Sequence, residues 1–172
     1  MVGLEVLDAK QIHLSNEDIS SIAEIECHPN VREWLYDYVY PGAKKELRDY
    51  HEFFRKLPEN RQADVLVARS DGRIVGFLAL WRLGTYMSHV ASIGISVHPD
   101  YWGKGIATQL IESATELAKQ KGIKRLEVET LSDNTSMRHV VEKLGFKLEG
   151  MRKGRVRKGR RYHDEAAYYL LL

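Results

Sequence analysis

The sequence of 172 residues contains a single cysteine and no run of about 18 apolar residues that would predict a membrane span. One cysteine excludes an intramolecular disulfide and is typical of a reducing compartment, so we expect a cytoplasmic protein. The N-terminus lacks the basic and then apolar pattern of a secretory signal. The net charge of +2 is too small to predict nucleic-acid binding from composition.

Motifs of several catalytic and metal sites are also missing. The seven histidines are scattered, with no His-Glu-x-x-His and no Cys-x-x-Cys, so we expect no metal site. Neither Gly-x-Ser-x-Gly nor Gly-x-x-x-x-Gly-Lys-Ser/Thr occurs, which argues against a common serine hydrolase and against a P-loop. Cys27 precedes His28-Pro29, which resembles no nucleophile motif, and we interpret it as a buried structural thiol.

The composition that is present, 44% hydrophobic and 29% charged, is typical of a globular protein. This length is that of one domain, so we expect residues 1–172 to form a single domain. Residue patterns predict antiparallel strands at 64–68 and 74–81 and a strand–helix–strand unit over 90–130. Such a unit is parallel, which predicts an α/β fold with a mixed sheet.

The centre of that unit is a loop with two glycines. After the strand at 90–97 and Gly103, Lys104-Gly105 occupies the expected N-cap of a long amphipathic helix, so no Asp, Asn, Ser or Thr side chain caps it. Uncapped N–H groups at a positive helix end favour an anion such as phosphate. A tight strand-to-helix turn is the alternative explanation of the glycines. Thr108 stands where the dinucleotide fingerprint requires a third glycine, so that motif is excluded.

Two blocks carry a resemblance to a known family. Residues 102–107, Trp-Gly-Lys-Gly-Ile-Ala, resemble the pyrophosphate loop Gln/Arg-x-x-Gly-x-Gly/Ala of the GNAT acetyltransferases, with Trp102 in place of Gln or Arg. Asn134-x-x-Met137, followed by Glu-Lys-Leu-Gly-Phe at 142–146, resembles the second block. The residues of this loop are similar to those in the branch of ribosomal-protein N-terminal acetyltransferases and small-amine acetyltransferases. The resemblance implies a mostly antiparallel sheet of about six or seven strands, flanked by helices, whose one parallel unit holds acyl-CoA.

The resemblance further implies acetyl-CoA as co-substrate and no metal. Backbone N–H groups of residues 103–108 would hold the pyrophosphate, and the strand edge 95–97 would pair with the pantetheine amides. Asn134 would contact the coenzyme near its thiol. The cofactor-binding residues expected in this way are Ile95, Ser96, Val97, Trp102, Gly103, Lys104, Gly105, Ile106, Ala107, Thr108, Asn134, Met137 and Lys143.

The implied reaction is direct transfer of an acetyl group to a primary amine, either a protein N-terminus or a small amine such as a polyamine. Glu129, five residues before Asn134, holds the place of the general base in the resembling branch. From the strand pattern alone it is a solvated or salt-bridged glutamate. Many members carry a proton-donating tyrosine seven residues after the Asn, where this chain has Val141. Alternative proton donors are Tyr101, Ser136 and Tyr162.

The acceptor cannot be identified from these motifs. Trp34, Tyr36 and Tyr38 lie in a segment that borders the acceptor pocket in the family, although such aromatics are also typical of a core. Residues 152–161 include seven basic residues, which predict a solvated hairpin or a site for coenzyme phosphates, an acidic partner or RNA. The remaining alternatives are a non-catalytic acyl-CoA-binding or regulatory module and a ribosome- or RNA-associated protein. A homodimer is a family expectation, and no membrane partner is expected.

Overall fold

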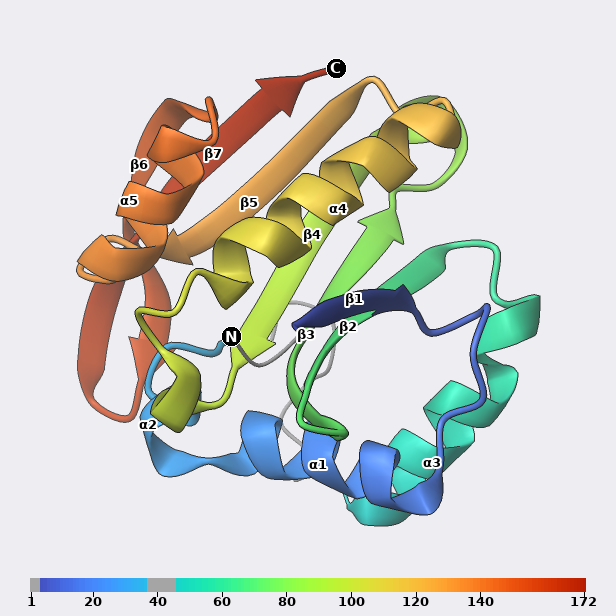
Figure 1. The fold of residues 1–172 in the computed structure, drawn as a ribbon. Helices are drawn as coiled ribbons and strands as arrows, with labels where there is room; N and C mark the ends of the chain where they lie inside the picture. The colour runs from blue at the N-terminus through green and yellow to red at the C-terminus, as the bar shows by residue number, and fades with distance from the viewer. Residues whose placement is uncertain (1–3, 37–45) are drawn as a thin grey trace.

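The computed structural model describes residues 4–36 and 46–172, so the predicted acceptor contact Tyr38 lies outside the described residues. A seven-stranded sheet runs through the described part in the order β1-β2-β3-β4-β5-β7-β6 (Figure 1). The strands are β1 (Glu5–Asp8), β2 (Ala63–Ser70), β3 (Arg73–Arg82), β4 (Val90–Val97), β5 (Arg125–Leu131), β6 (Lys147–Lys158) and β7 (Arg161–Leu171). Neighbours are antiparallel except β4 and β5. The predicted mixed sheet is confirmed.

The helices are α1 (Asn16–Cys27), α2 (Pro29–Arg32), α3 (Leu47–Lys56), α4 (Ile106–Gln120) and α5 (Thr135–Lys143), with short 3₁₀ turns at Leu57–Glu59, Thr85–Met87 and Pro99–Tyr101. Ser15 caps α1, since its Oγ accepts from the Asp18 N–H at 3.1 Å. Cys27 is exposed, so the expected buried thiol is wrong; Ile22 and Ile25 fill the buried positions of α1. No helix of the described residues is long and apolar enough to cross a membrane.

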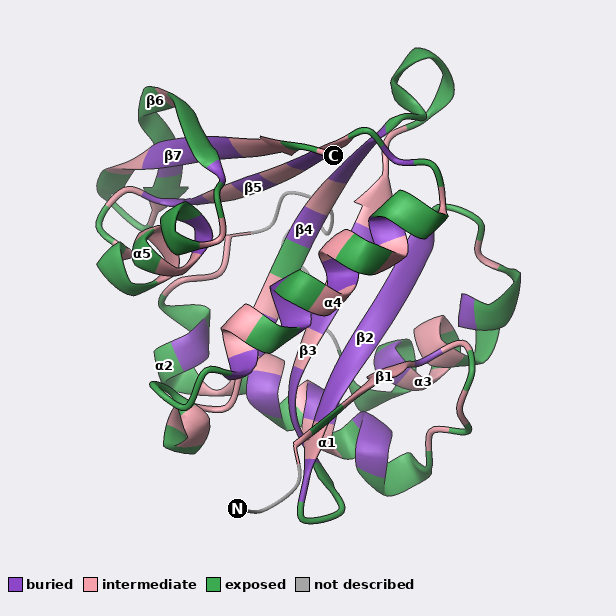
Figure 2. Cartoon of the chain, turned by 45° about the horizontal axis from the view of Figure 1, so that its top comes forward, coloured by how far each residue is buried: buried purple, intermediate pink, exposed green. Residues whose placement is uncertain are grey.

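An apolar core packs against each face of the sheet. One face packs against α4 and α5, and the other packs against α1 and α3. Leu110, Ile111 and Ala114 of α4 are wholly buried, and Figure 2 shows α4 buried toward the sheet and exposed on its outer side. Burying one leucine or isoleucine is worth roughly 1.5–3 kcal/mol, so this face fixes α4 on the sheet.

Gly76 in β3 sets how closely α4 approaches the sheet. A Cβ atom at Gly76 would lie 3.2 Å from Val97 Cγ2 and 3.3 Å from Ile106 Cγ2. Val97 ends β4 and Ile106 begins α4. A close approach of this kind is a common reason for a glycine inside a strand. It brings the first turn of α4 directly against the end of β4.

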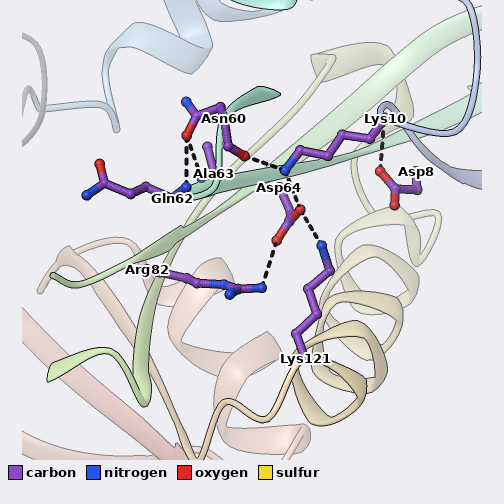
Figure 3. Close-up of polar contacts among 8 residues, drawn as sticks. All are labelled: Asp8, Lys10, Asn60, Gln62, Ala63, Asp64, Arg82 and Lys121. Carbon is purple, nitrogen blue, oxygen red and sulfur yellow. Dashed lines mark hydrogen bonds and ion pairs between the residues drawn. The ribbon is translucent and has the colours of Figure 1, made fainter. Parts of the chain in front are cut away.

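The opposite end of α4 is held by a buried carboxylate, Asp64 of β2 (Figure 3). Asp64 Oδ1 accepts from Lys10 Nζ at 2.8 Å and from Lys121 Nζ at 2.6 Å, and Arg82 Nη2 lies 3.7 Å from Oδ2. Burial raises the pKa of Asp64, but hydrogen bonds from Lys10 and Lys121 outweigh it, and the net pKa is below its ordinary value. Because Lys121 is the C-cap of α4, this cluster ties the helix to β2 and β3.

Candidate active site

The N-terminus of α4 presents a row of open backbone N–H groups. Gly105, the N-cap, has φ +79° and Gly103 has φ +73°, conformations that glycine adopts most readily. No described side chain caps the helix, and its first i→i−4 hydrogen bond runs from the Gln109 N–H to the Gly105 carbonyl at 3.1 Å. Across the described chain, the N–H groups of residues 103–108 have no hydrogen-bond acceptor. Six consecutive donors at the positive end of a 15-residue helix are an arrangement that favours an anion.

Trp102, which precedes this row, ties the loop to the end of β4. Its indole Nε1 donates to the Val97 carbonyl at 2.7 Å, although the side chain is 46% exposed. Lys104 Nζ lies 4.6 Å from the centre of the Tyr101 ring, a cation–π contact. These two contacts connect Trp102 to the end of β4 and the Lys104 side chain to Tyr101.

The strands β4 and β5 part next to this loop. Their parallel pairing runs from Val90 opposite Arg125 to Ile93 opposite Val128 and then ends, although both strands continue (Figure 1). The bonds of His98 N–H to the Val75 carbonyl (2.8 Å) and of Leu83 N–H to the Val90 carbonyl (3.0 Å) show that even-numbered residues of β4 face β3. The main-chain groups of odd-numbered residues therefore face the opening toward β5.

Among the three predicted edge residues, Ile95 and Val97 thus direct their N–H and C=O groups into the opening, whereas the Ser96 main chain faces β3. The Val97 carbonyl already accepts the hydrogen bond from Trp102 Nε1. The Ile95 groups and the Val97 N–H remain available along the described chain. An extended ligand with amide groups can pair with this edge as an added strand does. The edge ends where the row of open N–H groups begins.

Glu129 lies on the other side of the opening, one residue beyond the last β4–β5 pair. Its side chain is 20% exposed, and its carboxylate accepts a hydrogen bond from Arg152 Nη1 of β6. The same Nη1 donates to Glu165 Oε2 of β7 at 2.5 Å. These bonds to Glu129 and Glu165 raise the pKa of Arg152 above its ordinary value. The salt-bridged alternative for Glu129 is present, and it keeps the carboxylate at the opening.

Glu165 was not predicted as a site residue. It is wholly buried, and its Oε1 atom has no hydrogen-bond partner within residues 4–36 and 46–172. Arg152 Nη1 donates to both Glu165 and Glu129, so the two carboxylates are close together although they lie on different strands. The available sequence signal is a glutamate directly before the buried pair Ala166-Ala167 in a strand. A buried carboxylate needs a compensating charge, which Arg152 supplies.

The basic stretch 152–161 forms most of the β6–β7 hairpin, whose turn lies at Gly159 as predicted. Arg152 is 44% exposed, as expected of a solvated face, and its guanidinium also binds two glutamates. Lys153 Nζ pairs with Asp164 Oδ2 at 2.7 Å on the exposed side of the hairpin. Arg152 and Lys153 are therefore both exposed and both paired with carboxylates.

A cavity of about 590 Å³ adjoins Glu165. It lies between the segment after α2 and the β6–β7 hairpin, and Lys158 Nζ donates to the Glu33 carbonyl across it. Of the predicted acceptor contacts, Tyr36 lines the cavity, whereas Trp34 is half-buried outside its lining. Its described lining residues are Leu35, Tyr36, Arg155, Val156, Arg157, Lys158 and Glu165. A cavity of this size suits a small ligand.

The second block places its residues on α5 at different depths. Asn134 is the N-cap, and its Oδ1 accepts from the Met137 N–H at 3.2 Å, while Met137 packs against the core. Lys143 is the last residue of α5, about 13.5 Å along the axis from Asn134 at 1.5 Å per residue, and is exposed. The structure therefore brings Asn134 and Met137 together and leaves Lys143 at the other end of the helix.

The proton donors proposed to replace the family tyrosine are not gathered at one point. Val141 is wholly buried in the core of α4 and α5. Tyr162 is 68% exposed on the hairpin, and Ser136 is exposed on the first turn of α5. Tyr168 donates to Glu142 Oε1 at 2.6 Å, and burial followed by this bond raises its pKa. In the part of the chain that the structure describes, no three His, Cys, Asp or Glu side chains group as a metal site would.

Comparison with known proteins decides the family. Residues 28–146, more than half of the chain, match the model of the acetyltransferase (GNAT) family. The chain belongs to the GNAT acetyltransferase family. This GNAT chain is 28% identical over 160 residues to the Escherichia coli L-amino acid N-acetyltransferase AaaT, covering 92% of this chain and 93% of AaaT. It is also 28% identical over 143 residues to E. coli spermidine N(1)-acetyltransferase, covering 80% and 72%.

Solved structures confirm the GNAT fold. The structure of yncA from Salmonella typhimurium, solved with its cofactor acetyl-CoA, aligns at a TM-score of 0.80 with 18% identity, covering 98% of this chain and 94% of that one. Ribosomal-protein-alanine N-acetyltransferase from Brucella melitensis aligns at 0.79 with 19% identity, covering 94% and 98%. At these identities the likeness establishes the arrangement of helices and strands.

Proposed function

We propose that this GNAT protein is an N-acetyltransferase that transfers an acetyl group from acetyl-CoA directly to a primary amine. The observation that carries the proposal is the row of six open N–H groups at residues 103–108, which continues into the unpaired edge of β4. A diphosphate followed by an extended chain with amides matches this order of donors. We take residues 1–172 as one catalytic domain that acts in the cytoplasm, as the single cysteine predicts.

In this arrangement the pyrophosphate binds the N–H groups of residues 103–108, and the pantetheine amides pair with Ile95 and Val97. An open N–H group at this edge also stabilises the negative charge that develops on the thioester oxygen. Asn134 contacts the coenzyme near its thiol. Trp102 supports the site indirectly, since its bond to the Val97 carbonyl fixes the loop against the strand.

Glu129 takes the proton from the acceptor ammonium, directly or through a water molecule, because only the neutral amine attacks the thioester. The C–N bond forms, the C–S bond breaks and the thiolate leaves. Val141 cannot protonate the thiolate, so we assign that step to solvent. Positioning two substrates in one site supplies much of the rate, which makes this weaker acid catalysis sufficient.

The same Val141 supports the second candidate, a non-catalytic module that binds acyl-CoA. A screen of free thiol release from acetyl-CoA across peptide N-termini, L-amino acids and polyamines separates the two. An acetyltransferase releases coenzyme A with at least one class of amine. A binding module is stabilised against heat by coenzyme A but releases none.

A further inference from the structure

The cavity beside Glu165 is lined mainly by positive charge. Arg155, Arg157 and Lys158 contribute three cations, whereas Glu165 is the one carboxylate among its described lining residues. Arg152 already binds Glu165 Oε2, and Arg155 Nε lies 4.0 Å from the same oxygen. Glu165 is therefore paired with Arg152, which is outside the lining, and lies near Arg155, which is part of it. The described lining has more positive than negative side chains.

Lys158 shows this excess most clearly. Its ammonium donates to the backbone carbonyl of Glu33, and no described carboxylate lies within ion-pair distance. Burial lowers the pKa of Lys158 below its ordinary value. Arg157 likewise donates to the Gly159 carbonyl and has no described carboxylate partner. Asp133 and Glu33 attract the Lys158 ammonium from beyond ion-pair distance, but burial outweighs them, and an anionic ligand in the cavity would add the direct charge partner.

Glu165 provides the complementary group in the same cavity. Its buried Oε1 has no hydrogen-bond partner among the described residues, and its carboxylate lies beside the cations of the lining. Through Arg152, Glu165 is joined to Glu129 at the opening between β4 and β5. A ligand in the cavity therefore lies on the side of the sheet where the acceptor amine must approach.

We propose that this cavity selects small acceptor amines that also carry a negatively charged group, as an amino acid carries its carboxylate. This inference rests on the proposed function. A polyamine brings further positive charge next to Arg155, Arg157 and Lys158, so the cavity discriminates against it. Lys158 determines specificity by pairing with the negatively charged group of the acceptor. It is not one of the residues proposed to bind the coenzyme.

The test compares matched acceptors in the thiol-release assay at saturating acetyl-CoA. Each L-amino acid is paired with its own primary amide, which keeps the amine and replaces the carboxylate by a neutral group, and spermidine is included. We expect kcat/KM for the preferred amino acid to exceed that for its amide by about tenfold or more, as for loss of a hydrogen bond to a charged group. Lys158→Gln should reduce this ratio several-fold through KM of the acid, with KM for acetyl-CoA unchanged.

Two variants provide controls. Arg160→Gln makes the same change of charge at the hairpin turn, outside the cavity lining, and should leave the ratio unchanged. Lys158→Arg should retain most of the preference. Amides or spermidine that react as well as the acids would overturn the inference and leave the acetyltransferase intact. If no amine releases thiol, the proposed function fails. Calorimetric titration of the same acid and amide pairs into the coenzyme A complex then tests the inference, which requires the acid to bind more tightly than its amide.

Discussion

Gly105→Ala is the sharpest test of the anion site at α4, because Gly122→Ala is a matched control at the other end of the same helix. Gly105 has φ +79° and Gly122 has φ +74°, and a Cβ at either position would meet no atom within 4 Å. The cost of each substitution is therefore backbone strain, about 1–2 kcal/mol. For a domain of this size, 1 kcal/mol lowers Tm by about 2–4 °C, so both variants should lose about 2–8 °C.

Affinity for coenzyme A should separate the two variants. Gly105 begins the helix at the open N–H groups, and a shifted or covered N–H there loses a hydrogen bond to a charged phosphate. Such a loss costs about 1.5–3 kcal/mol, which is about 10- to 150-fold in Kd. Gly122 follows the C-terminal end of α4 and has no part in the anion site. Gly122→Ala should therefore bind coenzyme A as the parent does.

Calorimetric titration with coenzyme A gives Kd for each protein, and thermal unfolding with and without coenzyme A gives the ligand-dependent rise in Tm. The expected result is an equal fall in Tm for both unliganded variants and a loss of binding confined to Gly105→Ala. Equal affinities in the two variants, with equal falls in Tm, would refute the assignment of the pyrophosphate to the N-terminus of α4.

Three further predictions follow from the same structure. Glu129→Gln should lower kcat by about 10²- to 10⁴-fold with KM for acetyl-CoA unchanged, whereas Glu127→Gln, two residues earlier on the same face of β5, should have little effect; equal rates would remove Glu129 from catalysis. Asp64→Asn should cost about 3–5 kcal/mol at about pH 7 in urea unfolding, because it leaves buried cations without their carboxylate. The folded pKa of Asp64 is lowered, so its contribution is present above its ordinary pKa and is lost as pH falls through the folded value. The variant should lose less stability on acidification than the parent, and parallel pH profiles would contradict this. Trp102→Phe removes the bond to the Val97 carbonyl and should weaken coenzyme A binding by about 2- to 12-fold at about 0.5–1.5 kcal/mol; unchanged affinity would show that the loop does not need this bond.

The structure of the loop before α4 could be predicted from the sequence because its determinants are local. The spacing of apolar residues defines α4, and glycines at the cap position, without a capping side chain, predict open N–H groups. The close approach at Gly76 is not local: its neighbours Val97 and Ile106 are 21 and 30 residues away, so only the structure identifies them.

The carboxylate cluster could not be predicted in the same way. Arg152 meets Glu129 across 23 residues and Glu165 across 13, through the pairing of β5, β6 and β7. A register irregularity between Arg152 and Val156 decides which hairpin residues face inward, and no local pattern locates it. The point at which β4 and β5 part is likewise a property of two strands, and the sequence of either strand alone does not indicate it.

The most direct measurement is a crystal structure of the protein with coenzyme A bound. Phosphate oxygens should lie about 3 Å from backbone nitrogens within residues 103–108, with the pantetheine arm along Ile95 and Val97 and the sulfur near Glu129. A pyrophosphate bound elsewhere, for example on the hairpin at residues 152–161, would contradict the central claim that the N-terminus of α4 holds the coenzyme.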